Sequence, residues 1–185
     1  MTDKIRLRDI AGFCPEEAVW KMLADLSGLM EDGRVPFSPN PDNILVDGDS
    51  FLPDMSSGVE EEFLAPEQEG QETTAEQAVW ALGATAYFMA TGHIVFGGYG
   101  GKYQLLHPHV ALPNMPKAFQ TLTPVLHRCV PSKPSERIGL KELGTLARKG
   151  LDACRSRKQT VRQKDSFTET KAGHYDGWPE EMIEI

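Results

Sequence analysis

Apolar side chains recur at helical spacing in several segments of the chain. After Pro15, they fall on one face of a helix expected to end near Gly33, at Val19, Met22, Leu23, Leu26, Leu29 and Met30. Residues 119–130 and 138–151 predict two further amphipathic helices. Residues 75–91 leave almost no polar face, and a helix that is apolar on every side is normally covered on every side. The pattern predicts a mainly α-helical fold around one central apolar helix.

One short segment has the pattern of a strand instead. Residues 43–49 read Asn-Ile-Leu-Val-Asp-Gly-Asp, a buried strand that runs into an Asp-Gly turn, and this predicts a short β-hairpin. The glycine-rich residues 97–103 are expected to form a flexible connecting loop. They do not fit a phosphate-binding loop, because Phe96 stands where a glycine is needed and Tyr103 where a Ser or Thr is needed.

Composition narrows the class of protein. The 185 residues suffice for one compact domain, and no apolar run approaches the roughly 20 residues that span a bilayer. A formal net charge of -8 argues against a nucleic-acid-binding protein. Cys14, Cys129 and Cys154 are odd in number and far apart, so neither a zinc site nor a disulfide framework is indicated. We expect a cytoplasmic protein without a cofactor or bound metal.

Charge is distributed unevenly along the chain. No Lys or Arg occurs between residues 35 and 101, where acidic residues accumulate, whereas five basic residues lie between 155 and 164. We therefore expect a globular domain over residues 1–154 and a basic, polar tail over residues 155–185. The tail is either a solvated terminus or a docking segment for an acidic surface.

Four segments occur in an order that is typical of one family. Residues 63–67 read Phe-Leu-Ala-Pro-Glu, residues 80–83 Trp-Ala-Leu-Gly and residues 134–137 Pro-Ser-Glu-Arg, and residues 33–47 precede them with a loop and a strand. At these spacings they resemble the activation-segment end, central helix, late arginine and catalytic loop of a eukaryotic-type protein kinase. The resemblance covers the C-terminal lobe only, so it implies a fold without an N-lobe.

The resemblance also implies that catalysis is lost. In kinases the catalytic loop begins His-Arg-Asp, whereas here Phe37 and Ser38 occupy the last two positions and Asn40 replaces a lysine. A serine hydroxyl cannot act as the base near neutral pH. Only Asn43 and Asp54 correspond to magnesium ligands, and the elements of an N-lobe that position ATP are missing. We therefore expect no kinase activity and no enzyme.

What the resemblance retains is structural. It implies a buried ion pair between Glu67 and Arg137, which would join the end of the activation segment to the last helices. The alternative is that both are unrelated surface residues. His107 and His109 could bind one metal, but no third ligand is evident, so an ordinary loop is favoured.

The favoured function is a non-enzymatic scaffold that binds another protein, similar to the kinase non-catalytic C-lobe domain. The expected surfaces are the face that an N-lobe would cover and the acidic residues Glu60, Glu61 and Glu62. A regulatory sensor that binds a metal-nucleotide through Asn43 and Asp54 is the main alternative. An unrelated helical enzyme is a third, and the oligomeric state stays open.

Overall fold

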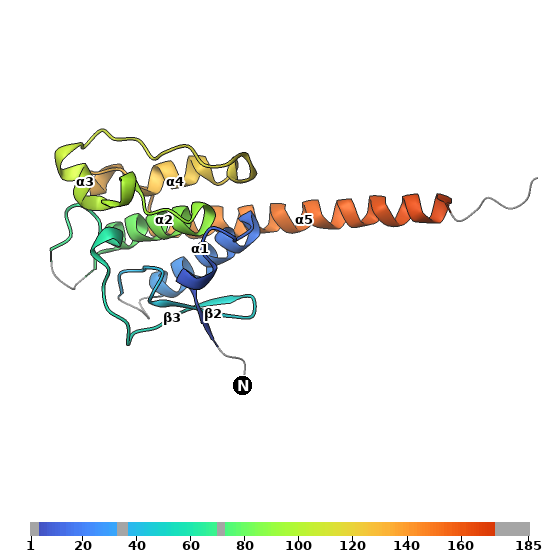
Figure 1. The fold of residues 1–185 in the computed structure, drawn as a ribbon, viewed down its shortest axis with the longest axis horizontal. Coiled ribbons are helices and arrows are strands. Elements are labelled where there is room, and N and C mark those ends of the chain that lie inside the picture. The colour runs from blue at the N-terminus through green and yellow to red at the C-terminus, as the bar shows by residue number, and fades with distance from the viewer. Residues whose placement is uncertain (1–3, 33–36, 70–72, 173–185) are drawn as a thin grey trace, which may run out of the picture.

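The computed structural model describes residues 4–32, 37–69 and 73–172. Helices dominate these ranges and a small antiparallel sheet lies at one side, so the mainly α-helical prediction is confirmed (Figure 1). The α-helices are α1 (Glu16–Glu31), α2 (Ala75–Thr91), α3 (Gly101–Leu106), α4 (Thr123–Cys129) and α5 (Leu140–Ala172). Short 3-10 helices are η1 (Leu7–Ile10), η2 (Glu61–Phe63), η3 (Phe96–Gly98), η4 (Lys117–Phe119) and η5 (Pro134–Glu136). Within the described ranges, every helix is too short or too polar to cross a lipid bilayer.

Helix α2 is the central apolar helix that the sequence predicts. Every residue from Gln77 to Ala90 is buried. Its first turn is closed by a capping box, in which the Thr74 hydroxyl accepts from the Gln77 N–H at 3.2 Å and the Gln77 side chain accepts from the Thr74 N–H at 2.9 Å. It ends at Gly92, whose φ of 74° is the left-handed conformation that glycine adopts at little cost. The capping box and Gly92 define the two ends of α2, and its burial places it in the middle of the core.

Helices α1 and α5 pack along each other. The contact is close because Gly150 of α5 has no side chain: a Cβ there would lie 2.4 Å from Cε2 of the Trp20 ring on α1. Helix α5 then continues without a break to Ala172, about 50 Å in all at 1.5 Å per residue. The first part of the expected tail is thus the outer half of this helix, which runs away from the rest of the described chain (Figure 1). Residues 173–185 lie outside the described residues.

The sheet contains the predicted hairpin and one strand that was not predicted. Strands β2 (Ile44–Asp47) and β3 (Ser50–Pro53) are antiparallel and meet at a turn in which Gly48 has a φ of 59°. Strand β1 (Ile5–Arg6) pairs with the other edge of β2. Inner residues of the hairpin, Ile44 and Phe51, join the core.

The glycine-rich segment is more ordered in its architecture than expected. The prediction of a flexible loop over residues 97–103 is wrong, because η3 and the start of α3 occupy much of this segment. A Cβ on Gly100 would lie 2.0 Å from the carbonyl oxygen of Glu62, and one on Gly101 would lie 2.2 Å from that of Leu64. These two glycines allow the backbone of α3 to approach the backbone beside η2 closely.

Candidate functional site

The residues aligned with a catalytic loop form a closed hydrogen-bonded unit. The Asn40 N–H donates to Oδ1 of Asn43 at 2.8 Å, and Nδ2 of Asn43 donates to the Ser38 carbonyl at 2.8 Å. Oδ1 of Asn40 accepts from the N–H groups of Asp42 (2.9 Å) and Asn43 (3.1 Å), and its Nδ2 donates to the Gly58 carbonyl at 3.3 Å. Both amides are therefore engaged in holding the loop. The preceding residues of the match, 33–36, lie outside the described residues.

Ser38 and Phe37 have no polar role in this loop. The Phe37 side chain is part of the hydrophobic core. The Ser38 hydroxyl is buried and has no hydrogen-bond partner among the described residues. A buried hydroxyl with no adjacent base cannot be activated as a nucleophile, nor can it accept a substrate proton.

A backbone hydrogen bond joins Asp54 to Asn43: the Asp54 N–H donates to the Asn43 carbonyl at 2.7 Å. Its carboxylate, however, is bonded elsewhere. Oδ1 accepts from the Ser56 N–H (3.0 Å) and hydroxyl (2.6 Å), and Oδ2 accepts from the Ser57 hydroxyl at 3.1 Å. The hydrogen bonds from Ser56 lower the pKa of the Asp54 carboxyl, so it is an anion at neutral pH.

The guanidinium of Arg6, on β1, lies next to the Asp54 carboxylate. Nη2 of Arg6 lies 3.4 Å from Oδ2 of Asp54, and Nη1 donates to the Ser57 hydroxyl at 2.7 Å and to the Asp42 carbonyl. In the described part of the chain, no group of three or more His, Cys, Asp or Glu side chains is arranged to hold a metal ion. Asn43 and Asp54 are thus neighbours, but their side chains do not form a ready magnesium site.

Next to this pair lies a cluster of two carboxyls and one guanidinium. Arg8 donates to Asp42 from Nε at 2.7 Å and to both carboxylate oxygens of Glu60 from Nη2. Burial, and a hydrogen bond with Asp42, raise the pKa of Glu60 to about 7. The same hydrogen bond and the Arg8 guanidinium lower the pKa of Asp42. Glu60 therefore holds a proton to a higher pH than Asp42 does, because the pKa values of the two carboxyls are shifted in opposite directions.

The three consecutive glutamates do not form a single acidic surface. Glu60 is half-buried against Arg8, while Glu61 is exposed and pairs with Lys102 of α3. Glu62 is exposed, and the carbonyl of the same residue lies against Gly100. Of the three side chains proposed to bind a partner, only those of Glu61 and Glu62 lie on the outer surface.

The structure brings Glu67 and Arg137 together in a two-pronged ion pair. Nη1 and Nη2 of Arg137 donate to Oε1 and Oε2 of Glu67 at 2.6 and 2.7 Å. The remaining N–H groups bind backbone carbonyls, those of Pro131 (2.9 Å), Glu76 (3.0 Å) and Ser132 (3.0 Å). The Arg137 side chain is 0% exposed, whereas that of Glu67 is 30% exposed. One buried guanidinium therefore ties residue 67, the start of α2 and the segment before α5 to one another.

A second set of buried polar contacts, centred on Gln104, was not predicted from the sequence. The indole N–H of Trp80, on α2, donates to Oε1 of Gln104 on α3 at 2.9 Å, and Nε2 of Gln104 donates to the Val130 carbonyl at 2.8 Å. A lone Gln on a short helix carries no periodic signal that marks it as buried. Its position between α2 and the end of α4 is visible only in three dimensions.

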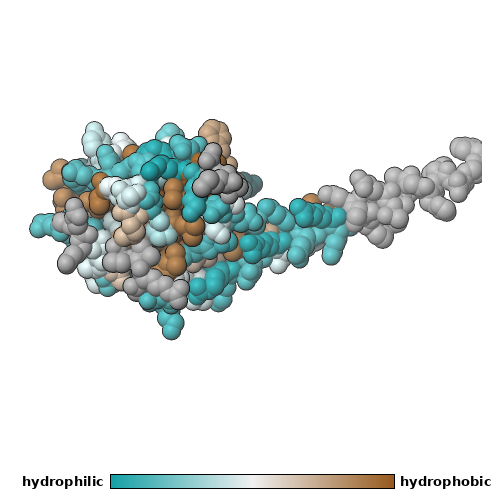
Figure 2. Space-filling view, turned by 90° about the horizontal axis from the view of Figure 1, so that it is seen from below, coloured by the Kyte–Doolittle hydropathy of each residue, from teal (hydrophilic) through white to brown (hydrophobic). Residues whose placement is uncertain are grey.

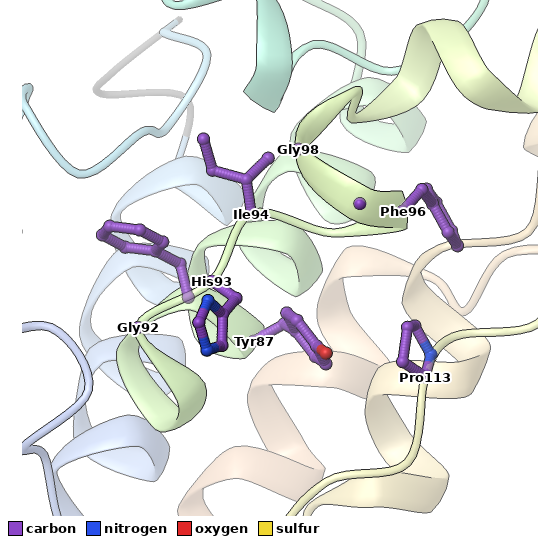
Figure 3. Close-up of a pocket in the computed structure, with 9 residues that line it drawn as sticks. Tyr87, Gly92, His93, Ile94, Phe96, Gly98 and Pro113 are labelled. Carbon is purple, nitrogen blue, oxygen red and sulfur yellow. The ribbon is translucent and has the colours of Figure 1, made fainter.

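A surface pocket of 520 Å³ lies at the end of α2 (Figure 3). Its lining includes Tyr87, His93, Phe96 and Pro113. Burial raises the pKa of the Tyr87 phenol. The lining contains no carboxylate and no thiol, so the His93 imidazole has neither an orienting acid nor a nucleophile to activate.

The remaining histidines do not form a metal site either. The rings of His107 and Tyr103 lie 4.3 Å apart, centroid to centroid, so this imidazole packs on an aromatic ring. His109 and His127 line another surface pocket, of 230 Å³, together with Glu136. No arrangement of three ligands results in the residues that the structure describes.

No protein-family model matches this sequence, and a search of the curated proteins finds no similar chain.

Proposed function

We propose that this chain is a catalytically inactive, kinase-C-lobe-like module that binds another protein. The observation that carries the proposal is the closed network of Ser38, Asn40 and Asn43, in which position 38 offers no carboxylate base and the Asn43 amide is bonded within the loop. Positioning of the nucleotide and of the acceptor hydroxyl is nearly the whole of phosphoryl-transfer catalysis. On this proposal, the described residues position neither the nucleotide nor the acceptor hydroxyl.

The Glu67–Arg137 pair supports the architectural part of the proposal. A kinase C-lobe uses such a pair to fasten the end of its activation segment. The Glu67–Arg137 ion pair, next to a central apolar helix, supports a similar role in this chain. The likeness of fold remains our proposal and follows from the motifs and their spacing.

The binding face that we propose surrounds β1 and residues 55–59. It carries three exposed apolar side chains, Ile5, Met55 and Val59, close to the Arg6 and Arg8 contacts described above. Figure 2 views the molecule from the side of the sheet, where hydrophobic residues are interspersed with hydrophilic ones. A contiguous apolar patch rimmed by polar residues marks a protein-binding surface, and we propose that these three side chains belong to such a patch. Glu61 and Glu62 extend this face with negative charge.

Affinity capture with matched variants tests the proposal. The full chain, a Met55→Asp/Val59→Asp variant and a Phe13→Asp control are used as bait. Among the residues that the structure describes, Phe13 is the most exposed large apolar one, and it belongs to a different segment. We expect a stoichiometric partner that is retained by the wild type and the control and lost with the double variant. Calorimetry with the purified partner should show the same order, and equal binding by all three baits would contradict the proposed face.

A metal-nucleotide sensor is the alternative function, through Asn43 and Asp54. The Asp54 carboxylate favours it by being anionic, but Arg6 and two serines already surround that carboxylate. Ligand at 100 times its dissociation constant would raise the free energy of unfolding by about 2.7 kcal/mol. We expect ATP with magnesium to leave the melting temperature of the full chain unchanged. A shift that is lost in Asp54→Ala would establish the sensor instead.

A reducing, cytoplasmic compartment fits the same proposal. All three cysteines are buried free thiols, and burial raises the pKa of Cys14 to about 11 and of Cys129 to about 12.

A helical enzyme of another kind would need an acid–base pair in a pocket, and the pocket beside His93 does not supply one.

A further inference from the structure

A third surface pocket, of 410 Å³, lies where α5 leaves the rest of the described chain. It is bordered by α1, by α4 together with Thr121, two residues before its start, and by α5. Its lining is mostly apolar, with two cations at its edge, and consists of Trp20, Thr121, Val125, Leu146, Lys149, Gly150, Ala153 and Arg157. This pocket is separate from the sheet face proposed above for a partner.

Two features of the lining indicate the chemistry of an occupant. Trp20 is 2% exposed, and its indole N–H has no acceptor in the described part of the chain. Lys149 is exposed, and Arg157 lies 3.1 Å from Glu16 with its side chain 58% exposed. An apolar hollow with a positive edge fits a peptide that combines apolar and acidic side chains.

The last thirteen residues of the sequence, 173–185, have this composition. They contain no Lys or Arg. Their acidic residues are Asp176, Glu180, Glu181 and Glu184, and their large apolar residues are Tyr175, Trp178, Met182, Ile183 and Ile185. This segment therefore complements both the apolar lining and the charge of the pocket edge.

The segment is also long enough to reach the pocket. From Ala172 back to Ala153 and Lys149, α5 spans about 28–35 Å at 1.5 Å per residue. From Ala172 to Ile183, an extended chain covers about 36–40 Å at 3.3–3.6 Å per residue. A chain that reverses direction after Ala172 can thus place residues 180–183 at the pocket.

We propose that residues 173–185 fold back along α5 of the same molecule and bind this pocket. Met182 and Ile183 then contact the apolar lining, and the glutamates on either side face Lys149 and Arg157. The occupant is thus residues 173–185 of the same chain. In the pocket, this segment covers the apolar surface that α5 leaves between α1 and α4. This inference does not depend on the proposed function.

The test uses the full chain labelled with 5-fluorotryptophan, which gives ¹⁹F resonances for Trp20, Trp80 and Trp178. Each is assigned from a single Trp→Phe variant. We expect Met182→Asp/Ile183→Asp to shift the Trp20 resonance and to narrow that of Trp178, because both rings leave a packed environment. The Trp80 resonance should not move, since this side chain is fully buried in α2.

Charge variants on α5 supply the matched comparison. Lys149→Glu should reproduce the Trp20 shift, and adding Glu181→Lys should reverse it. Lys141→Glu, also exposed on α5 but not part of the pocket, should change nothing. A Trp20 resonance that is identical in wild type and Met182→Asp/Ile183→Asp would overturn the proposal. A shift that appears only as protein concentration rises, with dimers in solution, would overturn it in favour of a second copy.

Discussion

Arg137 holds Glu67 with both ends of its guanidinium, at 2.6 and 2.7 Å, and does so with no exposed side-chain surface. The partners are 70 residues apart in the sequence. The pair therefore fixes the relation between two distant segments, and three backbone carbonyls use the remaining donors of the same guanidinium.

Loss of the carboxylate should be costly. Glu67→Ala leaves the guanidinium buried without its counter-charge, so we expect the free energy of unfolding to fall by about 3–5 kcal/mol. Glu142→Ala is the control, since it breaks the exposed Arg128–Glu142 pair and should cost less than about 1 kcal/mol. Urea unfolding measures both. Equal losses in the two variants would show that the Glu67–Arg137 pair acts as an ordinary surface contact.

The fit of α5 on α1 depends on the missing side chain at position 150. A Cβ at Gly150 would lie 2.4 and 2.5 Å from two ring carbons of Trp20, so Gly150→Ala should destabilise the protein by about 1–3 kcal/mol through overpacking.

Gly28 of α1 provides the matched control. Nothing lies within 4 Å of a Cβ at that position, so Gly28→Ala should stabilise the protein by about 0.5–1 kcal/mol through helix propensity. The melting temperature should thus fall in Gly150→Ala and rise in Gly28→Ala, although both replace a glycine by alanine. A stabilised Gly150→Ala variant would contradict the packing described here.

Much of this fold follows from local pattern. The all-apolar run predicts α2, and the Asp-Gly turn predicts the β2–β3 hairpin, because each depends on neighbours in the sequence. Strand β1 has only two residues and forms because β2 has a free edge. Gly100 and Gly101 were expected to be flexible, but their function is close backbone contact with a segment far away in the sequence.

The candidate site was predictable to a lesser extent. Motif spacing related Glu67 to Arg137, and the alignment with a catalytic loop selected Ser38, Asn40 and Asn43. Nothing in the run Glu60–Glu61–Glu62 indicates that the first turns inward, because that depends on Arg8, which is 52 residues away. Buried polar partners of this kind are fixed by the assembled core.

Glu60 should make stability depend on pH. Its native pKa of about 7, raised by burial and by Asp42, lies above the ordinary value of 4.5. Between these two values the native state retains a proton that the unfolded state has lost, so this group makes the free energy of unfolding fall as the pH rises from about 4.5 to 7.

Glu60→Gln removes this titration. We therefore expect the variant to gain stability relative to the wild type as the pH is raised from 5 to 8, measured by urea unfolding at each pH. Glu61→Gln alters an exposed pair and should track the wild type more closely. Parallel curves for Glu60→Gln and wild type would show that Glu60 is not protonated in the native state.

Two hydrogen-bonded positions of the loop before β2, Ser38 and Asn43, should respond in opposite ways to alanine. Ser38 has a buried hydroxyl without a partner, and a buried group of this kind costs about 1–3 kcal/mol, so Ser38→Ala should leave stability unchanged or raise it. Asn43→Ala removes the acceptor for the Asn40 N–H and the donor to the Ser38 carbonyl, two buried bonds of 2.8 Å. At about 1–1.5 kcal/mol for each bond, it should lower the free energy of unfolding by about 2–3 kcal/mol. Urea unfolding of both variants measures these changes, and a Ser38→Ala protein less stable than Asn43→Ala would contradict the hydrogen-bonding roles described for this loop.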